Sequence, residues 1–364
     1  MWDLGAGAWA ERRAPTLDVI HAATSAVGGG IQTMVLALAR DAAAAGANVR
    51  VLFWRGEYPS APGVPYVKLE STGRMRGWPR SLLAYLRVFR PAIVHLHGPT
   101  AGSIGAVVAR AARVPVVVYT DHSPHGSRPP LGRAIRRLTA RLPHVNVAIS
   151  EEVARSLIED CGVPASRVRI ILNGTPIVDR VSQPVGSSRR FLYVANLLPG
   201  KDHETLLNAF ATLPDRATLE LVGDGPQRGA LEGMAQGLGV HQRVTFHGWL
   251  DDPWSIAGGV WVYVHPARIE GGGIAVMEAM MRELPIIATA TGGIPDIVRP
   301  GRAGVLVEVG DVKGLADSMR ELMVDEKRRS DLAVAAREHA VAQLSIDECL
   351  RRYWDLYDEL SARG

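Results

Sequence analysis

The chain has 364 residues, of which 47% are hydrophobic and 21% are charged. This length favours two domains, and this balance favours a folded globular protein over a disordered one. No apolar run is long enough to predict a membrane-spanning helix. The two cysteines, Cys161 and Cys349, are too few for a disulfide framework or a cysteine metal site, so we expect a protein of the reducing cytoplasm.

The charge is unevenly distributed along the chain. The first 178 residues hold 21 basic and 11 acidic side chains, whereas the remainder holds 20 basic and 26 acidic ones. This asymmetry predicts that the first half meets an anionic partner. The basic residues are not interleaved with a stacking platform, so we expect no nucleic acid partner.

The first half alternates apolar, strand-length runs with amphipathic segments, which is typical of a parallel sheet covered by helices. Strands are expected at 16–22, 48–53, 91–97, 114–120, 145–149 and 168–172. Helices are expected at 31–45, 103–113 and 151–159, the last one capped by Ser150.

After a linker-like stretch at 176–190, the same pattern starts again. Strands are expected at 191–195, 218–222, 244–247, 260–265, 286–289 and 304–307, and helices at 203–213, 227–238, 274–282 and 347–360. We therefore predict an α/β protein with two Rossmann-like domains, 1–178 and 179–345, followed by a terminal helix at 346–364. A ligand is expected outside the carboxyl ends of the strands.

The segment from Glu270 to Glu278 carries the clearest chemical signal. A run of three glycines leads into a helix beginning at Ile274, and such a turn offers bare backbone N–H groups to a phosphate. The two glutamates lie about 7 Å apart along the helix axis, so they suit different hydroxyl groups of one long ligand. Solvated glutamates beside a flexible glycine turn would give the same pattern.

Other loops that follow strands are less specific. Lys201 is placed to supply a cation, although a surface lysine is the simpler interpretation. Its loop is not a phosphate-binding P-loop, because Ala195 and Asp202 stand where that motif needs Gly and Ser or Thr. The Gly223–Pro226 and Gly292–Gly293 turns favour a structural role over ligand contact.

In the first half, Gly28-Gly29-Gly30 follows the first strand, and four histidines follow later apolar strands. These are His95, His97, His122 and His125. Their spacing predicts no metal site, and a structural role is the simpler interpretation for each one. At strand ends facing a cleft, they are also candidates for sugar contacts or proton chemistry. His97 and His125 are the candidates on the acceptor side.

The ordered series of motifs resembles glycosyltransferase family 4 from about residue 17 to about residue 308. The series is Gly-Gly-Gly, His-Leu-His-Gly, Thr-Asp-His, Ile-Leu-Asn-Gly, a loop lysine, Val-Gly-Asp-Gly-Pro, His-Gly-Trp, Glu-x7-Glu and Thr-Gly-Gly-Ile-Pro. The resemblance implies the GT-B fold, in which two Rossmann-like domains face each other across a cleft. It implies a UDP- or GDP-sugar donor, retention of the anomeric configuration, and no metal or other cofactor.

The resemblance also implies roles for single residues. Glu270 matches a contact to the donor sugar, Glu278 a contact to the ribose, and Lys201 the basic residue on the diphosphate. His122 resembles a histidine that hydrogen-bonds the transferred sugar, so His122, Glu270 and Lys201 are the expected catalytic set. The expected donor site also includes Gly29, Gly30, Asn196, Gly248, Trp249, Gly272, Gly273 and Ile274.

Two positions depart from the family pattern. Asn196 stands where arginine is common, which places more of the diphosphate charge on Lys201. Gly272 stands where a bulky apolar residue is usual, so the sugar cannot be assigned by analogy. The terminal helix is expected to cross back to the first domain.

Two segments of the first half predict amphipathic helices, 77–89 and 130–143. In the second, Leu131, Ile135, Leu138 and Leu142 share a stripe, with Arg133, Arg136, Arg137 and Arg141 elsewhere. Such a helix suits either an anionic membrane surface or a core with an arginine-rich solvent face. We therefore expect a glycan or lipid-linked acceptor, with the membrane surface at its cytoplasmic face as a further partner. A nucleotide-sugar epimerase and a non-catalytic scaffold are the alternatives for function.

Overall fold

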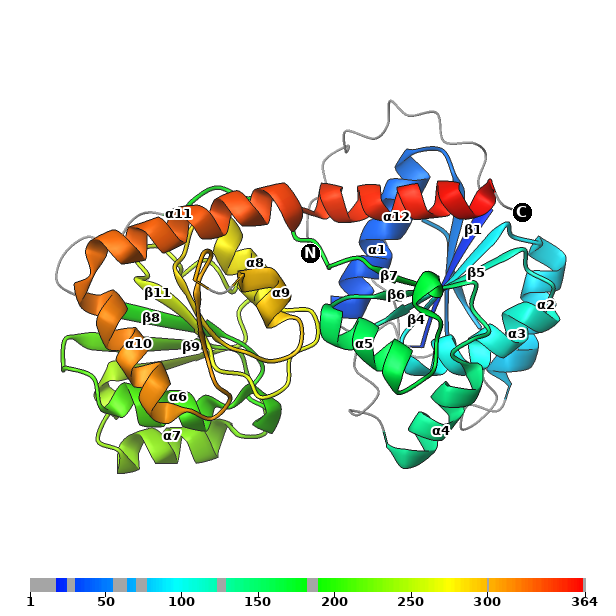
Figure 1. The fold of residues 1–364 in the computed structure, drawn as a ribbon. Helices are drawn as coiled ribbons and strands as arrows, with labels where there is room; N and C mark the ends of the chain where they lie inside the picture. Colours follow the sequence, from blue (N-terminus) through cyan, green and yellow to red (C-terminus); the bar gives the residue numbers. More distant parts are fainter. Residues whose placement is uncertain are drawn as a thin grey trace. The chain divides into compact units, whose positions relative to one another are not determined.

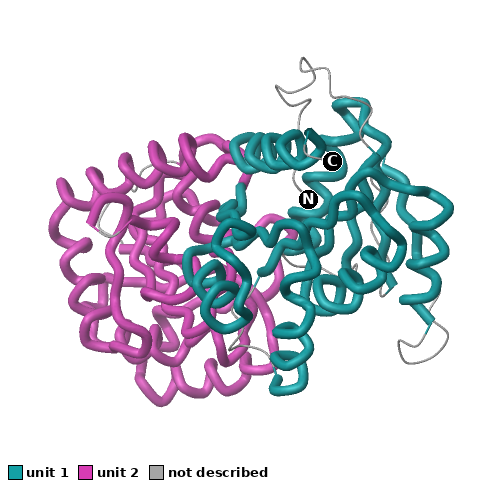
Figure 2. Tube along the Cα trace, turned by 45° about the vertical axis from the view of Figure 1, so that its right-hand side comes forward, with its two compact units in different colours: residues 1–174, 346–364 teal, residues 175–345 magenta. Residues whose placement is uncertain are grey.

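The computed structural model describes residues 18–24, 30–54, 64–69, 77–122, 129–181, 189–299 and 301–362. The chain divides into two compact units, which Figure 2 distinguishes by colour. Unit 1 comprises residues 1–174 with 346–364, and unit 2 comprises residues 175–345. The division falls slightly before the expected boundary at 178, because Thr175 already pairs with Ser345 inside unit 2.

Unit 1 is built on a seven-stranded parallel sheet in the order β3-β2-β1-β4-β5-β6-β7. Figure 1 labels β1, β4 and β5 among its strands. Its strands are β1 (Asp18–Ala23), β2 (Asn48–Phe53), β3 (Tyr66–Lys68), β4 (Ile93–His97), β5 (Val116–Asp121), β6 (Val145–Ala148) and β7 (Val168–Ile170). The edge strand β3 was not predicted, since its three residues, Tyr-Val-Lys, include a single aliphatic side chain.

The helices of unit 1 are α1 (Gly30–Ala44), α2 (Trp78–Phe89), α3 (Ala106–Ala111), α4 (Pro130–Thr139) and α5 (Glu151–Glu159). Ser150 caps α5, because its hydroxyl accepts a hydrogen bond from the Val153 N–H. The helix expected at 103–113 instead begins as the π-helix η1 (Ala101–Gly105). Gly102 lies there against the Tyr119 ring, where an added Cβ would be only 2.0 Å from a ring carbon.

The two predicted amphipathic helices pack differently. In α2, Trp78, Leu82 and Leu86 are buried in the core, so the core-packing interpretation is confirmed. In α4, Leu131 and Leu138 are 73% and 83% exposed, whereas the arginine at 136 is fully buried. Arg136 is therefore not part of an arginine-rich solvent face, and two leucines of the expected stripe lie outside the core.

The terminal helix α12 (Ile346–Ser361) belongs to unit 1. Its buried face includes Leu350, Tyr353 and Tyr357, which pack against strands β1, β4 and β5 and helix α1. Trp354 donates a hydrogen bond from Nε1 to the Asp41 carboxylate on α1, at 2.5 Å. The last helix of the chain is thus part of the core of the first unit.

Unit 2 is built on a six-stranded parallel sheet in the order β10-β9-β8-β11-β12-β13. Its strands are β8 (Arg189–Val194), β9 (Ala217–Val222), β10 (Val244–Gly248), β11 (Val262–His265), β12 (Ile286–Thr289) and β13 (Val305–Val307). Its helices are α6 (His203–Ala211), α7 (Arg228–Gly237), α8 (Ile274–Met281), α9 (Ile294–Val298), α10 (Val312–Val324) and α11 (Glu326–Gln343). Short 3-10 turns complete the described elements: η3 (Ala165–Arg167) in unit 1, and η4 (Pro199–Lys201) and η5 (His241–Arg243) in unit 2.

Both sheets change direction of winding once, between β1 and β4 in unit 1 and between β8 and β11 in unit 2. In open parallel sheets, the loops at the carboxyl ends of such neighbouring strands diverge and leave room for a ligand. This rule directs attention to the loops after β8 and β11. None of the helices within the described ranges is long and apolar enough to cross a membrane.

Candidate donor site and histidine network

The loop after β8 carries Lys201 at the end of η4. The Gly200 carbonyl accepts hydrogen bonds from the backbone N–H groups of Arg268 and Ile269, which lie in the loop after β11. The Lys201 carbonyl accepts a further hydrogen bond from the Tyr193 hydroxyl, at 2.9 Å. The two loops at the switch point of unit 2 are thereby joined, and Lys201 is directed at the residues that follow β11.

Glu270 is the centre of this arrangement. Its Oε2 atom lies 2.6 Å from Lys201 Nζ and 2.9 Å from His265 Nε2. Its Oε1 atom accepts hydrogen bonds from the backbone N–H groups of Gly271 and Gly273, at 3.1 and 3.2 Å. The N–H of Gly273, which precedes α8, is therefore not bare as the sequence predicted, because the Glu270 carboxylate already occupies it.

The environment keeps Glu270 ionised. Burial by itself would raise the pKa of this carboxyl group. The hydrogen bond and charge of His265 and the adjacent Lys201 ammonium outweigh burial, so the pKa lies well below its ordinary range. A carboxylate held in this state accepts hydrogen bonds and does not donate them, which suits contact with hydroxyl groups.

The glycine turns after β9 and β12 support these loops. A Cβ on Gly292 would lie 1.7 Å from the Glu270 carbonyl oxygen, and a Cβ on Gly223 would lie 2.1 Å from the Ala195 carbonyl oxygen. Gly225 approaches the Leu197 carbonyl in the same way, with a distance of 2.5 Å for an added Cβ. The close backbone contacts explain the glycines, which agrees with the structural role expected for both turns.

Glu278 lies on α8 and belongs to a second group of side chains. Its Oε2 atom accepts a hydrogen bond from Trp254 Nε1, at 3.0 Å. The Arg282 guanidinium lies over the Trp254 ring, 4.6 Å from its centroid, and donates a hydrogen bond to the Glu278 backbone carbonyl. Burial lowers the pKa of Arg282, while the charge of Glu278 opposes that effect. The Glu278 carboxylate is thus oriented by the buried Trp254.

The other predicted donor residues have different settings. Asn196 is exposed just after β8, and Trp249 is 73% exposed just after β10. Gly248 is buried, with a φ of 71°. Since all strands of the sheet are parallel, these residues share the carboxyl edge with Lys201 and Glu270. Gly272 and Ile274 are half-buried around the start of α8.

In unit 1, Gly30 is the first residue of α1, whereas Gly29 and His125 lie outside the described residues. His122 follows β5, and its ring centroid lies 6.2 Å from that of His97. Burial lowers the pKa of His122 to about 4, although the neighbouring Asp121 charge opposes this effect. His122 is therefore neutral at physiological pH and is able to donate or accept one hydrogen bond per ring nitrogen.

A buried histidine network lies beneath His122. The pairing of β1 with β4 sets His21 opposite His95, and His21 Nδ1 lies 3.1 Å from His97 Nε2. Both ring nitrogens of His95 are hydrogen-bonded to hydroxyl groups. Nδ1 lies 2.6 Å from the Tyr357 hydroxyl, and Nε2 lies 2.7 Å from the Thr120 hydroxyl. His97 is only 1% exposed, so the structure does not leave it open to an acceptor as the sequence predicted.

The same three histidines raise the question of a metal ion. Their nitrogen atoms, from His21, His95 and His97, lie within 4.8 Å of one another. A metal ligand must offer a free lone pair, yet both nitrogens of His95 are engaged with hydroxyl groups. The donor set therefore suits a hydrogen-bonded network better than a metal site.

Arg136 on α4 fixes the segment next to His122. Its guanidinium donates a hydrogen bond to Asn146 Oδ1 at 2.7 Å, and its Nε lies 3.5 Å from Asp121 Oδ2. It also lies over the Tyr119 ring, 4.4 Å from the centroid. Because the charge is compensated on several sides, the arginine is accommodated in the core and anchors α4 there.

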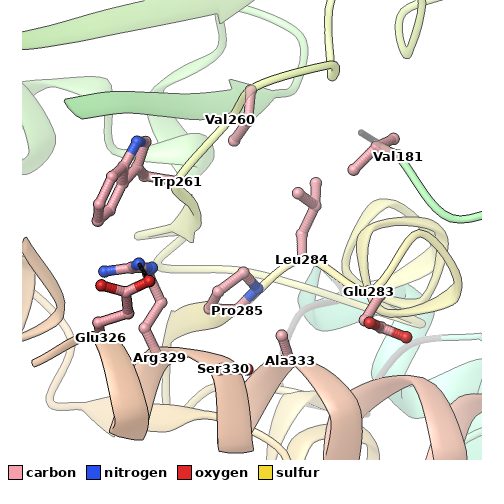
Figure 3. Close-up of a pocket in the computed structure, with 10 residues that line it drawn as sticks. All are labelled: Val181, Val260, Trp261, Glu283, Leu284, Pro285, Glu326, Arg329, Ser330 and Ala333. Atoms are coloured by element: carbon pink, nitrogen blue, oxygen red, sulfur yellow. Dashed lines mark ion pairs between the residues drawn. The ribbon is translucent and has the colours of Figure 1, made fainter. Parts of the chain in front are cut away.

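A small cavity of about 80 Å³ in unit 2 is separate from the donor site (Figure 3). Trp261, Leu284 and Arg329 are among the residues that line it. Trp261 comes just before β11 and Leu284 shortly before β12, so the cavity lies at the amino ends of these strands. Lys201 and Glu270 lie at the carboxyl ends, where parallel sheets bind ligands.

Two family models match the chain. Residues 28–178 match Glycosyltransferase Family 4, and residues 177–339 match Glycosyl transferases group 1. The chain belongs to the group 1, family 4 glycosyltransferases. The resemblance seen in the motifs is thus confirmed, and the second model ends shortly before α12.

Curated relatives agree with this family membership. LpsE of Rhizobium meliloti, a lipopolysaccharide core biosynthesis glycosyltransferase, is 33% identical over 156 residues, which cover 43% of this chain and 46% of LpsE. A GDP-mannose-dependent alpha-(1-6)-phosphatidylinositol monomannoside mannosyltransferase of Mycobacterium tuberculosis is 31% identical over 171 residues, or 44% of each protein. The chain therefore spans about half the length of the relatives that it matches.

Among solved structures, HepE of Anabaena in complex with UDP aligns with a TM-score of 0.83 and 19% identity. The alignment covers 94% of this chain and 100% of HepE. At this identity the likeness shows the fold, and the predicted GT-B class with two Rossmann-like domains is confirmed.

Sequence reasoning missed two residues of this candidate site, His265 and Trp254. His265 ends β11 just as His97 ends β4, so the same position at a strand end would have identified it. Trp254 carried no signal, because no sequence spacing links it to Glu278. Their contacts, 2.9 Å to Glu270 and 3.0 Å to Glu278, appear only in the folded chain.

Proposed function

We propose that the chain is a hexosyltransferase that moves a sugar from a UDP- or GDP-sugar to a glycan or lipid-linked acceptor, in glycan, polysaccharide or glycolipid assembly. The observation that carries this proposal is the Lys201–Glu270 pair, 2.6 Å apart at the carboxyl edge of unit 2. It sets a cation and a hydroxyl-binding carboxylate side by side. A nucleotide-sugar has the matching groups side by side, namely a diphosphate and a sugar ring.

Three residues then have distinct roles in the transfer. Lys201 balances the negative charge that develops on the departing diphosphate. Glu270 accepts hydrogen bonds from hydroxyl groups of the donor sugar. Glu278 lies on α8, beyond the glycine turn that carries Glu270, and accepts hydrogen bonds from the ribose hydroxyl groups. UDP in the HepE structure and GDP-mannose in the name of the mycobacterial relative support a nucleotide donor without choosing the base.

The reaction is proposed to retain the anomeric configuration and to need no metal ion. Lys201 supplies positive charge at the diphosphate, and the histidine network of unit 1 offers no free lone pair at His95. His122 is neutral in this setting and is proposed to hydrogen-bond the transferred sugar. Product stereochemistry read by NMR, together with turnover in excess EDTA, tests both statements. An inverted product contradicts the first, and loss of turnover in EDTA contradicts the second.

The deciding experiment measures nucleotide release from UDP-, GDP- and ADP-sugars with and without candidate acceptors. We expect release from a UDP- or GDP-sugar that depends on an acceptor. Conversion of one nucleotide-sugar into another without an acceptor would instead indicate an epimerase. No reaction with any nucleotide-sugar of the panel would indicate a non-catalytic scaffold.

Variants connect this activity to the site. We expect Glu270→Ala to abolish transfer and Glu278→Ala chiefly to raise KM for the donor. Glu220→Ala is the matched control, because Glu220 on β9 also pairs with a histidine, at 2.7 Å to His247 Nε2, and with Arg190. Turnover of the Glu270 variant at the rate of this control would remove Glu270 from the donor site.

The acceptor is proposed to be met at the cytoplasmic face of an anionic membrane. Helix α4 supports this idea, because Leu131 and Leu138 are 73% and 83% exposed beside Arg137, which is also exposed. Apolar side chains that reach into the headgroup region and arginines that pair with lipid phosphate act together. Flotation with anionic liposomes tests this. Binding that is salt-sensitive and weakened in Leu131→Ser/Leu138→Ser supports it, and no binding to liposomes refutes it.

A further inference from the structure

We propose that His265 is a positioning residue that keeps Glu270 in its working orientation when Lys201 turns to the donor diphosphate. This inference rests on the proposed function, which assigns Glu270 to the donor sugar and Lys201 to the diphosphate. It concerns what holds the carboxylate once a donor is bound.

The Glu270 carboxylate is fully occupied in the structure. The Oε2 atom accepts hydrogen bonds from Lys201 Nζ at 2.6 Å and from His265 Nε2 at 2.9 Å. The Oε1 atom accepts hydrogen bonds from the backbone N–H groups of Gly271 and Gly273, at 3.1 and 3.2 Å. A carboxylate offers about four lone-pair sites, so these four donors use all of them. A sugar hydroxyl gains access only when one donor leaves.

Lys201 is the donor that is free to leave. Its side chain is 25% exposed and ends a flexible stem, whereas the His265 side chain is 2% exposed and the two glycine N–H groups belong to the backbone. A diphosphate carries more negative charge than one carboxylate and attracts the ammonium group more strongly. When Lys201 moves to the diphosphate, one site on Oε2 opens for a hydroxyl group of the donor sugar.

The ring of His265 is held in the orientation in which Nε2 contacts Glu270. Its Nδ1 lies 3.3 Å from the Tyr263 hydroxyl, and the ring meets that of Tyr193 edge to face with centroids 5.4 Å apart. Because Glu270 is ionised, the Nε2 atom must carry the proton of the hydrogen bond between them. The Tyr263 hydroxyl also donates a hydrogen bond to the Val194 carbonyl, at 3.4 Å, so the side chain that contacts Nδ1 is itself anchored to β8.

After Lys201 has moved, His265 is the side-chain donor that stays on Oε2. Without it, a largely buried carboxylate would lose a charge-assisted hydrogen bond just as its neighbouring cation departs. The carboxyl group would then protonate more easily, and its orientation toward the sugar would be less defined. His265 therefore acts through Glu270 and is not itself expected to touch the donor.

The test compares the wild type with His265→Leu, which removes the donor, and His265→Gln, whose amide N–H reaches a similar position. His247→Leu is the matched control, because it breaks the equivalent 2.7 Å contact with Glu220. The full-length protein is saturated with UDP or GDP, and the Glu270 carboxyl signal is titrated by ¹³C NMR. The signal is assigned with Glu270→Gln, and thermal unfolding checks that each variant is folded.

In the wild type, the carboxyl group should stay ionised to the acid limit of the folded protein. In His265→Leu, its titration and the acid limb of kcat/KM should move to higher pH, with kcat/KM about tenfold to a hundredfold lower. His265→Gln should recover most of this loss, and His247→Leu should leave the titration and the acid limb unchanged.

Two results would overturn the proposal: a Glu270 titration in His265→Leu that matches the wild type, or a Gln variant that is folded but as impaired as the Leu variant. The titration needs nucleotide but no sugar transfer. If the wild type transfers no sugar while the Glu270 titration still responds to His265, the proposed function fails and the positioning role remains.

Discussion

The contact between Gly292 and Glu270 gives a sharp test of how the donor site is held. In Gly292→Ala, the new Cβ would lie 1.7 Å from the Glu270 carbonyl oxygen, and real Cβ atoms essentially never come closer than 3.0 Å. The backbones at Gly292 and Glu270 must therefore separate by at least 1.3 Å, the difference between these distances. A misplacement of about 1 Å in a catalytic group lowers the rate about a hundredfold.

The effect of backbone strain at residue 292 must be distinguished from the effect of moving Glu270. Gly292 has a φ of 57°, so alanine there also adopts a left-handed conformation, which costs about 1–2 kcal/mol. Gly239→Ala is the matched control, because Gly239 has a φ of 72° and an added Cβ meets no atom within 4 Å. Both variants should lose stability from strain, and only Gly292→Ala should lose activity.

The assay is acceptor-dependent nucleotide release at limiting donor, which yields kcat/KM, with thermal unfolding measured in parallel. We expect kcat/KM of Gly292→Ala to be about a hundredfold below that of Gly239→Ala. Equal values for the two folded variants would refute the reasoning, since they would show that the backbone position of Glu270 does not limit the reaction.

Three further predictions concern the rest of the molecule. In Trp254→Phe, Glu278 loses its 3.0 Å hydrogen bond, so KM for the donor should rise about tenfold with little change in kcat. In Tyr357→Phe, the buried His95 Nδ1 loses its partner, so the free energy of unfolding should fall by about 1–3 kcal/mol. Burial lowers the pKa of His21 from 6.5 to about 3, so the unfolded chain binds this proton first as the pH falls. Stability should therefore decrease from about pH 6.5 downward, by about 1.4 kcal/mol per pH unit for this residue.

Each of these predictions has its own control. Trp261→Phe removes an indole N–H that has no hydrogen-bond partner within the described ranges, and the donor KM should not change. Tyr85→Phe removes a hydroxyl group that pairs with Arg50 in a partly buried place, so its effect should be smaller. For the pH dependence, His21→Asn should flatten the slope below pH 6.5. A wild-type slope in that variant would show that His21 is not the responsible group.

The sequence by itself determined most of the strands and helices in both units, although it did not indicate β3 or α9. The strands expected at 48–53 and 286–289 match β2 and β12 residue for residue. Buried parallel strands need continuous apolar side chains, and that requirement is local and readable in the chain. The helix at 151–159 was equally clear, because its Ser150 cap and its apolar spacing are both local.

The sequence also placed the two glutamates of the donor site on a glycine turn and the helix that follows it. It did so because the Glu-x7-Glu spacing and the three glycines lie within nine consecutive residues. The loop lysine was recognised only through its place in a longer series of motifs. Spacing along the chain therefore determined which residues gather at the carboxyl edge of unit 2.

Only the tertiary structure decided which of those side chains contact one another. Lys201 and His265 meet on the same oxygen of Glu270 because β8 and β11 are neighbours in the sheet, although Lys201 lies 69 residues before Glu270. Likewise, the buried Arg136 and the His21–His97 contact depend on packing between distant elements. Hydrogen bonds and close packing act over about 3–4 Å in space, and sequence separation does not encode such distances.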